Sequence, residues 1–286
     1  MILVDEYKHS LKNADIEEYV DLLVFRPLAF LFVKAIYVTE LTPNQITLLS
    51  MVVGVGSGIC FGLGGRATMV AGGILLGIAT VFDCADGQLA RLKKNGTHFG
   101  RILDGVSDYV YTVAAFFGIA IGCRVEGMEV WVWWMFVGSA GLSYAIQAGL
   151  LDYYRNEYMA RAGGRSGFLT DELEEVVEER AKLSGEKGRF VAKALLLVYI
   201  EYSKLQRRFG GRHDKRDVLP LAGKTRLDDL RIKLWGLNGT STHVFVLMVC
   251  SIFGRLDVFL WYILGFGSIY SLALFVWEKA ISKVGR

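Results

Sequence analysis

The sequence has few of the residues that build disulfide-rich or zinc-binding domains. Its 286 residues include only four cysteines, and no two of them form a close C-x-x-C pair. All lie within or at the ends of apolar stretches, where free cysteine behaves as a small hydrophobic residue. We therefore expect neither a disulfide framework nor a zinc site at Cys60, Cys84, Cys123 and Cys250.

No cleavable signal peptide, internal repeat or low-complexity tract is visible. The first 20 residues are polar and charged, whereas a signal peptide carries an apolar core near its start. There are also only three prolines. We therefore expect a single domain with one added polar segment.

Long apolar stretches dominate the remainder. The chain is 53% hydrophobic with a mean hydropathy of +0.37, and a bilayer span needs about 20 mostly apolar residues. We predict an all-α integral membrane protein with six transmembrane helices, of which the fifth is the weakest. The predicted spans are approximately Asn44–Leu63, Ala67–Leu92, Phe99–Cys123, Val130–Leu151, Thr240–Phe253 and Val258–Ile281.

Basic residues orient these spans. Arg66, Arg124 and Arg255 each stand alone in a short connection on one side, and nearly all other Lys and Arg fall on the opposite side. Cytoplasmic loops carry the excess of positive charge. The asymmetry predicts that both termini face the cytoplasm.

Two segments lie outside the spans. Residues 1–40 contain an amphipathic stretch interrupted by Pro27, which we expect to lie along the cytoplasmic interface. A spanning helix is the alternative, disfavoured because charged residues flank only a short apolar run. Thr42 resembles an N-cap ahead of the spans in 41–151. Residues 152–237 form a charged, cytoplasmic helical segment before the last spans in 238–286.

Four aspartates interrupt the apolar pattern. Asp83 and Asp86 are three residues apart, and Asp104 and Asp108 are four apart, so each pair shares a helix face. A hairpin would bring the pairs together, where four carboxylates cannot all ionise without cations. Hard oxygen ligands suit Mg²⁺, Mn²⁺ or Ca²⁺, and two such ions would balance the charge. Two-metal sites serve phosphoryl chemistry. One aspartate could be a helix cap, but four in register indicate function.

The same stretch resembles a family signature. From Asp83 to Asp108 it reads D-x2-D-G-x2-A-R-x8-G-x3-D-x3-D, which is similar to the signature of the CDP-alcohol phosphotransferases. The "TPNQIT" stretch before the first span resembles that family too. The resemblance covers most of the chain except residues 152–237.

The resemblance implies a reaction. Such enzymes move a phosphoalcohol group from a CDP-linked alcohol, such as CDP-diacylglycerol, onto a second alcohol and release CMP. By the family pattern, Asp83, Asp86 and Asp104 bind two Mg²⁺ or Mn²⁺ ions, and Asp108 faces the ions as general base. The residues expected to shape the nucleotide pocket are Gly87, Ala90, Arg91, Gly100 and Asn44. Close helix packing is the alternative role of the two glycines.

The acceptor stays open at this point. Family acceptors include inositol phosphate, glycerol phosphate, serine and diacylglycerol. Arg155 and Arg101 are candidates to bind an acceptor phosphate, although a positive-inside anchor explains Arg155 equally well.

Two other classes compete with this reading. A cation- or proton-coupled transporter would distribute its acids over several helices, and a prenyl-diphosphate transferase needs a second Asp-rich motif. As partners we expect the bilayer, a CDP-alcohol and an alcohol acceptor but no nucleic acid, and a homodimer is compatible with the sequence. The active site is expected at the cytoplasmic face.

Overall fold

The structure of the chain is a computed structural model. It describes residues 2–11, 16–123, 127–163, 200 and 226–284. Within these ranges the regular structure is helical. The helices are α1 Ile2–Ser10, η1 Asp21–Phe25, α2 Arg26–Ile36, α3 Pro43–Leu63, α4 Arg66–Lys93, α5 His98–Gly122, α6 Val130–Gly163, α9 Arg226–Gly236, α10 Thr240–Phe253, α11 Leu256–Trp261, η2 Tyr262–Gly267 and α12 Ser268–Val284. The two η elements are π-helical turns.

Among the described residues, six helical stretches are long and apolar enough to cross a membrane, which agrees with the predicted number. The chain is a multi-pass integral membrane protein. The fifth stretch, Leu227–Phe253, joins α9 to α10 and begins earlier than the sequence suggested. The sequence did not predict this earlier start because α9 carries several charged residues. One of them, Arg231, forms an ion pair with Glu278 of α12.

The first helix of the membrane bundle has a well-defined start. Thr42 and Gln45 form a reciprocal capping box, in which each side chain accepts from the other's backbone N–H, and Pro43 follows the cap. This arrangement satisfies two of the otherwise unpaired N–H groups of the first turn. The predicted cap at Thr42 is confirmed.

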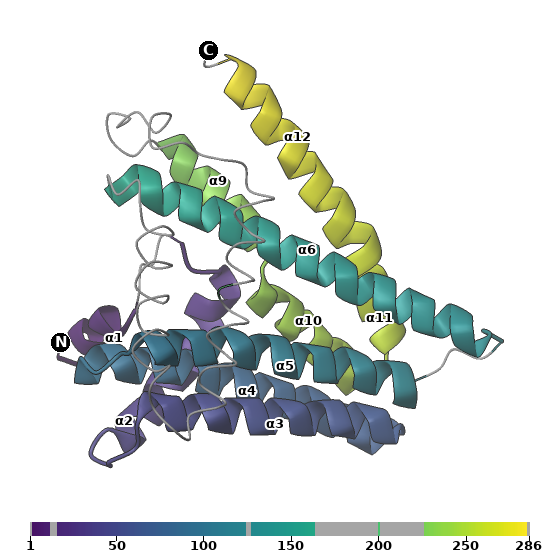
Figure 1. Ribbon diagram of the computed structural model, residues 1–286, viewed down its shortest axis with the longest axis horizontal. Helices are drawn as coiled ribbons and strands as arrows, with labels where there is room; N and C mark the ends of the chain where they lie inside the picture. The colour runs from purple at the N-terminus through teal and green to yellow at the C-terminus, as the bar shows by residue number, and fades with distance from the viewer. Residues whose placement is uncertain (1, 12–15, 124–126, 164–199, 201–225, 285–286) are drawn as a thin grey trace.

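Helices α3, α4 and α5 lie along one another and form one half of the described part of the molecule (Figure 1). Glycines allow α3 and α5 to approach closely. A Cβ on Gly58 would overlap the main chain at Ala114, and one on Gly118 would overlap the carbonyl of Gly58. Small residues at helix contacts are typical of membrane proteins.

The second half is made of α6, α10 and α12. In Figure 1, α6 and α12 lie above α3–α5, and α10 lies between the two halves. α10 packs against α4. α6 continues past Leu151, the predicted end of its span, to Gly163, because its last turns remain packed: Tyr154 stacks on Trp235 of α9 at 4.3 Å, and Tyr158 is buried.

The predicted N-terminal amphipathic stretch forms η1 and α2. Pro27 lies shortly after the π-helical turn η1, which runs without a break into α2, so the proline does not end the helix. Leu23 and Leu31 are exposed while Phe25 and Val33 are buried. This two-sided pattern suits an interfacial helix, and that position remains a prediction.

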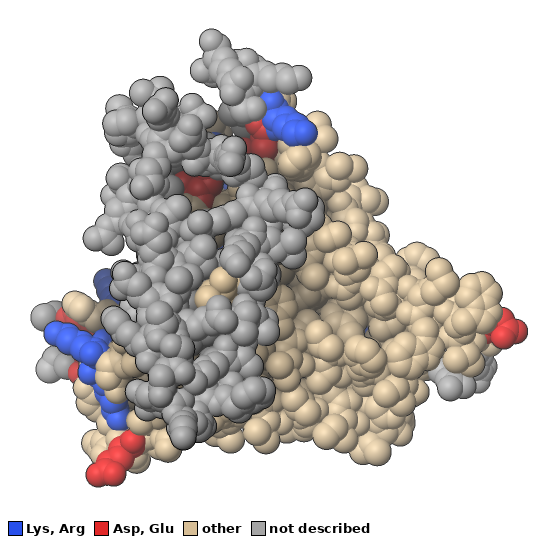
Figure 2. Space-filling model, in the orientation of Figure 1, with Lys and Arg blue, Asp and Glu red and all other residues tan. Residues whose placement is uncertain are grey.

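In Figure 2, charged side chains gather near α1 and α2 and near the end of α12. The described surface to the right of them is broad and uncharged except for an acidic group at its far tip. This distribution suits a membrane-embedded middle. Most of the polar segment predicted at 152–237 lies outside the described residues, and its described parts belong to α6 and α9.

Candidate active site

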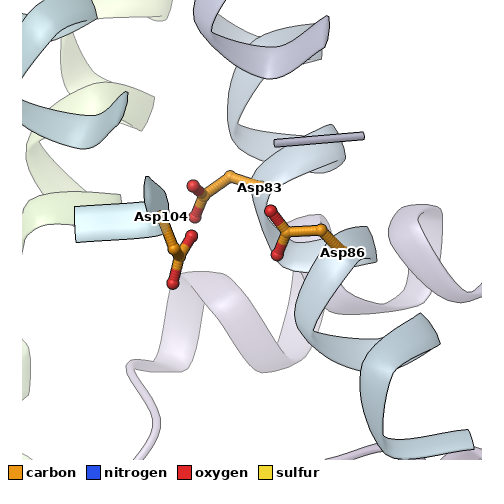
Figure 3. A group of neighbouring side chains, drawn as sticks. All are labelled: Asp83, Asp86 and Asp104. Carbon is orange, nitrogen blue, oxygen red and sulfur yellow. The ribbon is translucent and has the colours of Figure 1, made fainter. Parts of the chain in front are cut away.

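Three of the four aspartates converge. Asp83 and Asp86 project from α4 and Asp104 from α5, and one carboxylate oxygen of each lies within 4.8 Å of the others. Figure 3 shows the three carboxylates facing one shared space between the two helices. The predicted hairpin cluster is therefore present for these residues.

The hairpin turn aligns the two helices. α4 ends where Lys94 adopts a left-handed conformation, with φ of 53°. Thr97 then caps α5 by accepting a hydrogen bond from the N–H of Gly100 at 2.9 Å. Because Asp86 lies about two turns before the end of α4 and Asp104 about two turns into α5, the antiparallel hairpin brings them level.

Asp108 lies one turn further along α5 and is not a member of the group of three. Its Oδ1 accepts a hydrogen bond from the Tyr111 hydroxyl at 2.7 Å, and its side chain neighbours that of Asp83. The Asp108 carboxylate is thus held beside the cluster rather than within it. Its predicted roles as a metal ligand and as the general base stay predictions.

The cluster concentrates negative charge in a buried place. The strongest electrostatic interactions of Asp83 are with Asp108, Asp104 and Asp86, all of the same sign. Oδ1 of Asp83 is buried and has no hydrogen-bond partner in the part of the chain that the structure describes. Carboxylates arranged in this way fit a hard divalent cation, which would supply the missing positive charge.

One supporting residue was not predicted. The Thr47 hydroxyl of α3 donates to Oδ2 of Asp86, and Thr47 is only 2% exposed. A hydrogen bond from a neighbouring side chain fixes the orientation of a carboxylate that binds a metal. The sequence carried a weak signal for it, since Thr47 lies three residues after Asn44 on the same helix face.

The residues predicted for the nucleotide lie around the same hairpin. Oδ1 of Asn44 lies only 2.7 Å from the place that a Cβ on Gly100 would occupy, so the glycine permits this approach. Ala90 accepts a backbone hydrogen bond from Asn95 in the turn. The Arg91 guanidinium lies over Gly87 and donates through Nε to the carbonyl of Ser10.

The two predicted acceptor residues differ in their surroundings. Arg101 is exposed. Arg155 donates to the carbonyl of Ile16 at 3.2 Å and forms an ion pair with Glu18 at 3.3 Å. These contacts give Arg155 a structural task, and a role in binding the acceptor phosphate remains a prediction.

Glu18 is the centre of a second acidic cluster. It is 1% exposed, and its Oε2 accepts from the backbone N–H of Thr242 at 2.9 Å, at the start of α10. Burial raises the pKa of Glu18, and burial together with the Glu18 carboxylate raises the pKa of Asp21 to about 7.

Comparisons with known proteins agree with this geometry. Residues 40–169 match the model of the CDP-alcohol phosphatidyltransferase family. These residues include α3, the aspartate hairpin and α6.

Three curated proteins are similar to the chain. A phosphatidylinositol phosphate synthase of Corynebacterium glutamicum is 28% identical over 52% of this chain. A bifunctional IPC transferase and DIPP synthase of Aquifex aeolicus is 32% identical over 38% of this chain. An archaetidylinositol phosphate synthase of Pyrococcus horikoshii is 30% identical over 37% of this chain. The matches cover 61%, 25% and 53% of these relatives' own lengths. Residues 40–169 of this chain, which carry the aspartate hairpin, are thus similar to the CDP-alcohol phosphatidyltransferase family.

Proposed function

We propose that this protein transfers a phosphoalcohol group from a CDP-linked alcohol to an acceptor hydroxyl and releases CMP. The observation that carries the proposal is the convergence of Asp83, Asp86 and Asp104 within the segment that matches the family. A transporter is less favoured because these acids gather on one hairpin rather than along a path through several helices.

The chain's own residues divide the work. Asp83, Asp86 and Asp104 would hold two divalent ions, Mg²⁺ or Mn²⁺, which neutralise the diphosphate of the donor when bound. Asp108 takes the proton of the acceptor hydroxyl while the new P–O bond forms, and the bond to the CMP oxygen breaks. Tyr111 fixes the Asp108 carboxylate by its hydrogen bond. Asn44, Gly87, Ala90, Arg91 and Gly100 surround the nucleotide.

An inositol phosphate is the acceptor that we propose first. Two of the three relatives are named as synthases of inositol phosphate lipids. CDP-diacylglycerol is the first donor to test, because it is a membrane lipid that can reach the site from the bilayer. Arg101 and Arg155 remain the candidates for the acceptor phosphate.

The direct test is CMP release by the purified protein. CDP-diacylglycerol is supplied with myo-inositol 1-phosphate, glycerol 3-phosphate or serine, in Mg²⁺ and after chelation by EDTA. Mass spectrometry should find CMP and a lipid product with one acceptor, only when divalent ions are present. CMP release that continues undiminished in thoroughly chelated protein would refute the two-metal site.

We propose further that the hairpin turn and both termini face the cytoplasm, where the nucleotide is made. The basic-residue asymmetry supports this orientation. Single cysteines placed at Asn95 and Gly65 in a variant without native cysteines test it in intact cells. Labelling from outside is expected at Gly65, and labelling at Asn95 instead would reverse the topology. A homodimer stays a prediction.

A further inference from the structure

The N-terminal helix α1 lies outside the segment that matches the family, yet it packs on α4, the helix that carries Asp83 and Asp86. Its last residue, Ser10, is 0% exposed. The carbonyl of Ser10 accepts a hydrogen bond from Nε of Arg91 in the last turn of α4. The C-terminal end of a helix carries the negative pole of its dipole, which favours a cation. The end of α1 is therefore a suitable place for the Arg91 guanidinium.

The other end of the Arg91 guanidinium lies over Gly87. Nη1 and Nη2 are 3.3 and 3.4 Å from the place that a Cβ on Gly87 would occupy. Gly87 directly follows Asp86, and the charge of Arg91 interacts with that of Asp86. Nη2 is buried and has no hydrogen-bond partner among the residues that the structure describes. A buried donor without a partner costs free energy, so this place beside the aspartates favours a ligand that brings an acceptor atom.

Two contacts with α2 hold α1 in this position. The ring of Tyr7 packs edge-on against that of Phe30, with the ring centroids 5.3 Å apart. Glu6 forms an ion pair with Lys34 at 2.6 Å. These contacts fix α1 against α2, and they thereby fix the place of the Ser10 carbonyl at the end of α1.

We propose that α1 positions Arg91 to donate through Nη2 to a phosphate oxygen of the CDP-linked donor. The inference rests on the proposed function, which brings the donor's diphosphate to the aspartate hairpin. The Ser10 carbonyl occupies Nε, and Nη2 remains for the ligand. Phosphate oxygens match a guanidinium in charge and in geometry. Ser10 and Tyr7 are positioning residues, because they act through Arg91 rather than on the donor itself.

The test measures the affinity of the purified protein for CDP in Mg²⁺ by calorimetry, so the readout does not depend on turnover. Arg91→Met removes the guanidinium and should weaken CDP binding about 10- to 100-fold. Tyr7→Ala removes the contact with Phe30 and should weaken CDP binding roughly tenfold, at the low end of that range. Tyr7→Phe keeps the ring and should retain most of the affinity. Lys8→Ala, at an exposed position of α1, is the control and should bind CDP as the unaltered protein does.

The double variant Tyr7→Ala/Arg91→Met tests whether α1 acts through Arg91. It should bind CDP no more weakly than Arg91→Met alone, whereas independent effects would multiply. If Tyr7→Ala does not fold, Glu6→Lys takes its place, because it sets two cations against each other in the contact with α2. Glu6→Lys should weaken CDP binding about two- to fivefold, and Lys34→Glu in the same chain should restore it.

Three results would overturn the inference. They are multiplied losses in the double variant, undiminished CDP binding in Arg91→Met, and unchanged or tighter binding when α1 is detached by Tyr7→Ala or Glu6→Lys. A failure of the proposed function looks different, because the unaltered protein would then not bind CDP at all.

Discussion

Two clusters of acids in this protein differ in what neutralises them: the N-terminal cluster of Glu17, Glu18 and Asp21, and the hairpin cluster of Asp83, Asp86 and Asp104. In the N-terminal cluster, Arg26 pairs with Glu17 at 2.9 Å and Arg155 pairs with Glu18 at 3.3 Å. In the hairpin cluster, the strongest electrostatic interactions of Asp83 are with other aspartates.

We interpret this difference as one between a structural cluster and the cluster at which the proposed reaction takes place. Glu18 joins the N-terminal segment to α6 through Arg155 and to the start of α10 through Thr242, so its charge has partners supplied by the fold. Asp83 keeps a buried oxygen without a hydrogen-bond partner within the described ranges. Buried carboxylates left in that state must be neutralised, either by a proton or by a cation from outside the chain.

The largest expected effect concerns the base of the hairpin cluster. Asp108→Asn keeps the shape of the side chain but removes its capacity to accept a proton, so turnover should fall roughly 100-fold or more. Asp83→Asn should instead weaken metal and donor binding together. Donor affinity and turnover are measured for both variants at saturating Mg²⁺. Loss of donor binding in Asp108→Asn as complete as in Asp83→Asn would make Asp108 chiefly a ligand.

The N-terminal cluster can be broken by Arg155→Gln. This change leaves the buried Glu18 carboxylate without its ion pair, and the free energy of unfolding should fall by about 2–3 kcal/mol. The value is at the low end for such pairs because Arg155 is 21% exposed. Arg255→Gln is the control, since its exposed pair with Asp257 is worth little. A variant of Arg155 that keeps its stability but loses acceptor affinity would favour the acceptor role.

A smaller effect is expected at Thr47, which links α3 to the hairpin cluster. Thr47→Val removes the hydroxyl that orients Asp86, and Mg²⁺ affinity should fall about tenfold. Thr47→Ser keeps the hydroxyl and serves as the control. Calorimetric titration of Mg²⁺ measures both variants, and equal affinities would remove Thr47 from the site.

The smallest effect is a pH dependence in the N-terminal cluster. The folded protein holds a proton on Asp21 up to about pH 7, whereas the unfolded chain releases it near pH 4, so stability should fall as the pH rises between these values. The part lost between pH 6 and pH 7 should be about 1 kcal/mol. Asp21→Asn should remove it in chelated protein, while exposed Asp5→Asn should not. An unchanged slope of unfolding midpoint against pH in Asp21→Asn would contradict the assignment.

The sequence predicted what depends on short spacing and missed what depends on distant partners. The aspartate pairs and the Thr42 cap follow from separations of three or four residues, which helical geometry turns into a shared face or a closed cap. Thr47 and Asp86 are 39 residues apart, and Glu18 and Thr242 are 224 apart. No local pattern specifies such pairs, because they arise only when helices pack. For the same reason the sequence predicts an acceptor-binding role for Arg155, because its partner Glu18 lies 137 residues away.

The most direct test of a cation site at the hairpin cluster is Mn²⁺ binding to the purified, metal-free protein, measured by electron paramagnetic resonance or calorimetry. The unaltered protein should bind Mn²⁺, Asp83→Asn should bind it at least tenfold more weakly, and Glu18→Gln should bind it as tightly as the unaltered protein. This outcome would place the cation at the hairpin cluster. Equal Mn²⁺ affinity in Asp83→Asn and the unaltered protein, or a loss confined to Glu18→Gln, would contradict the central claim.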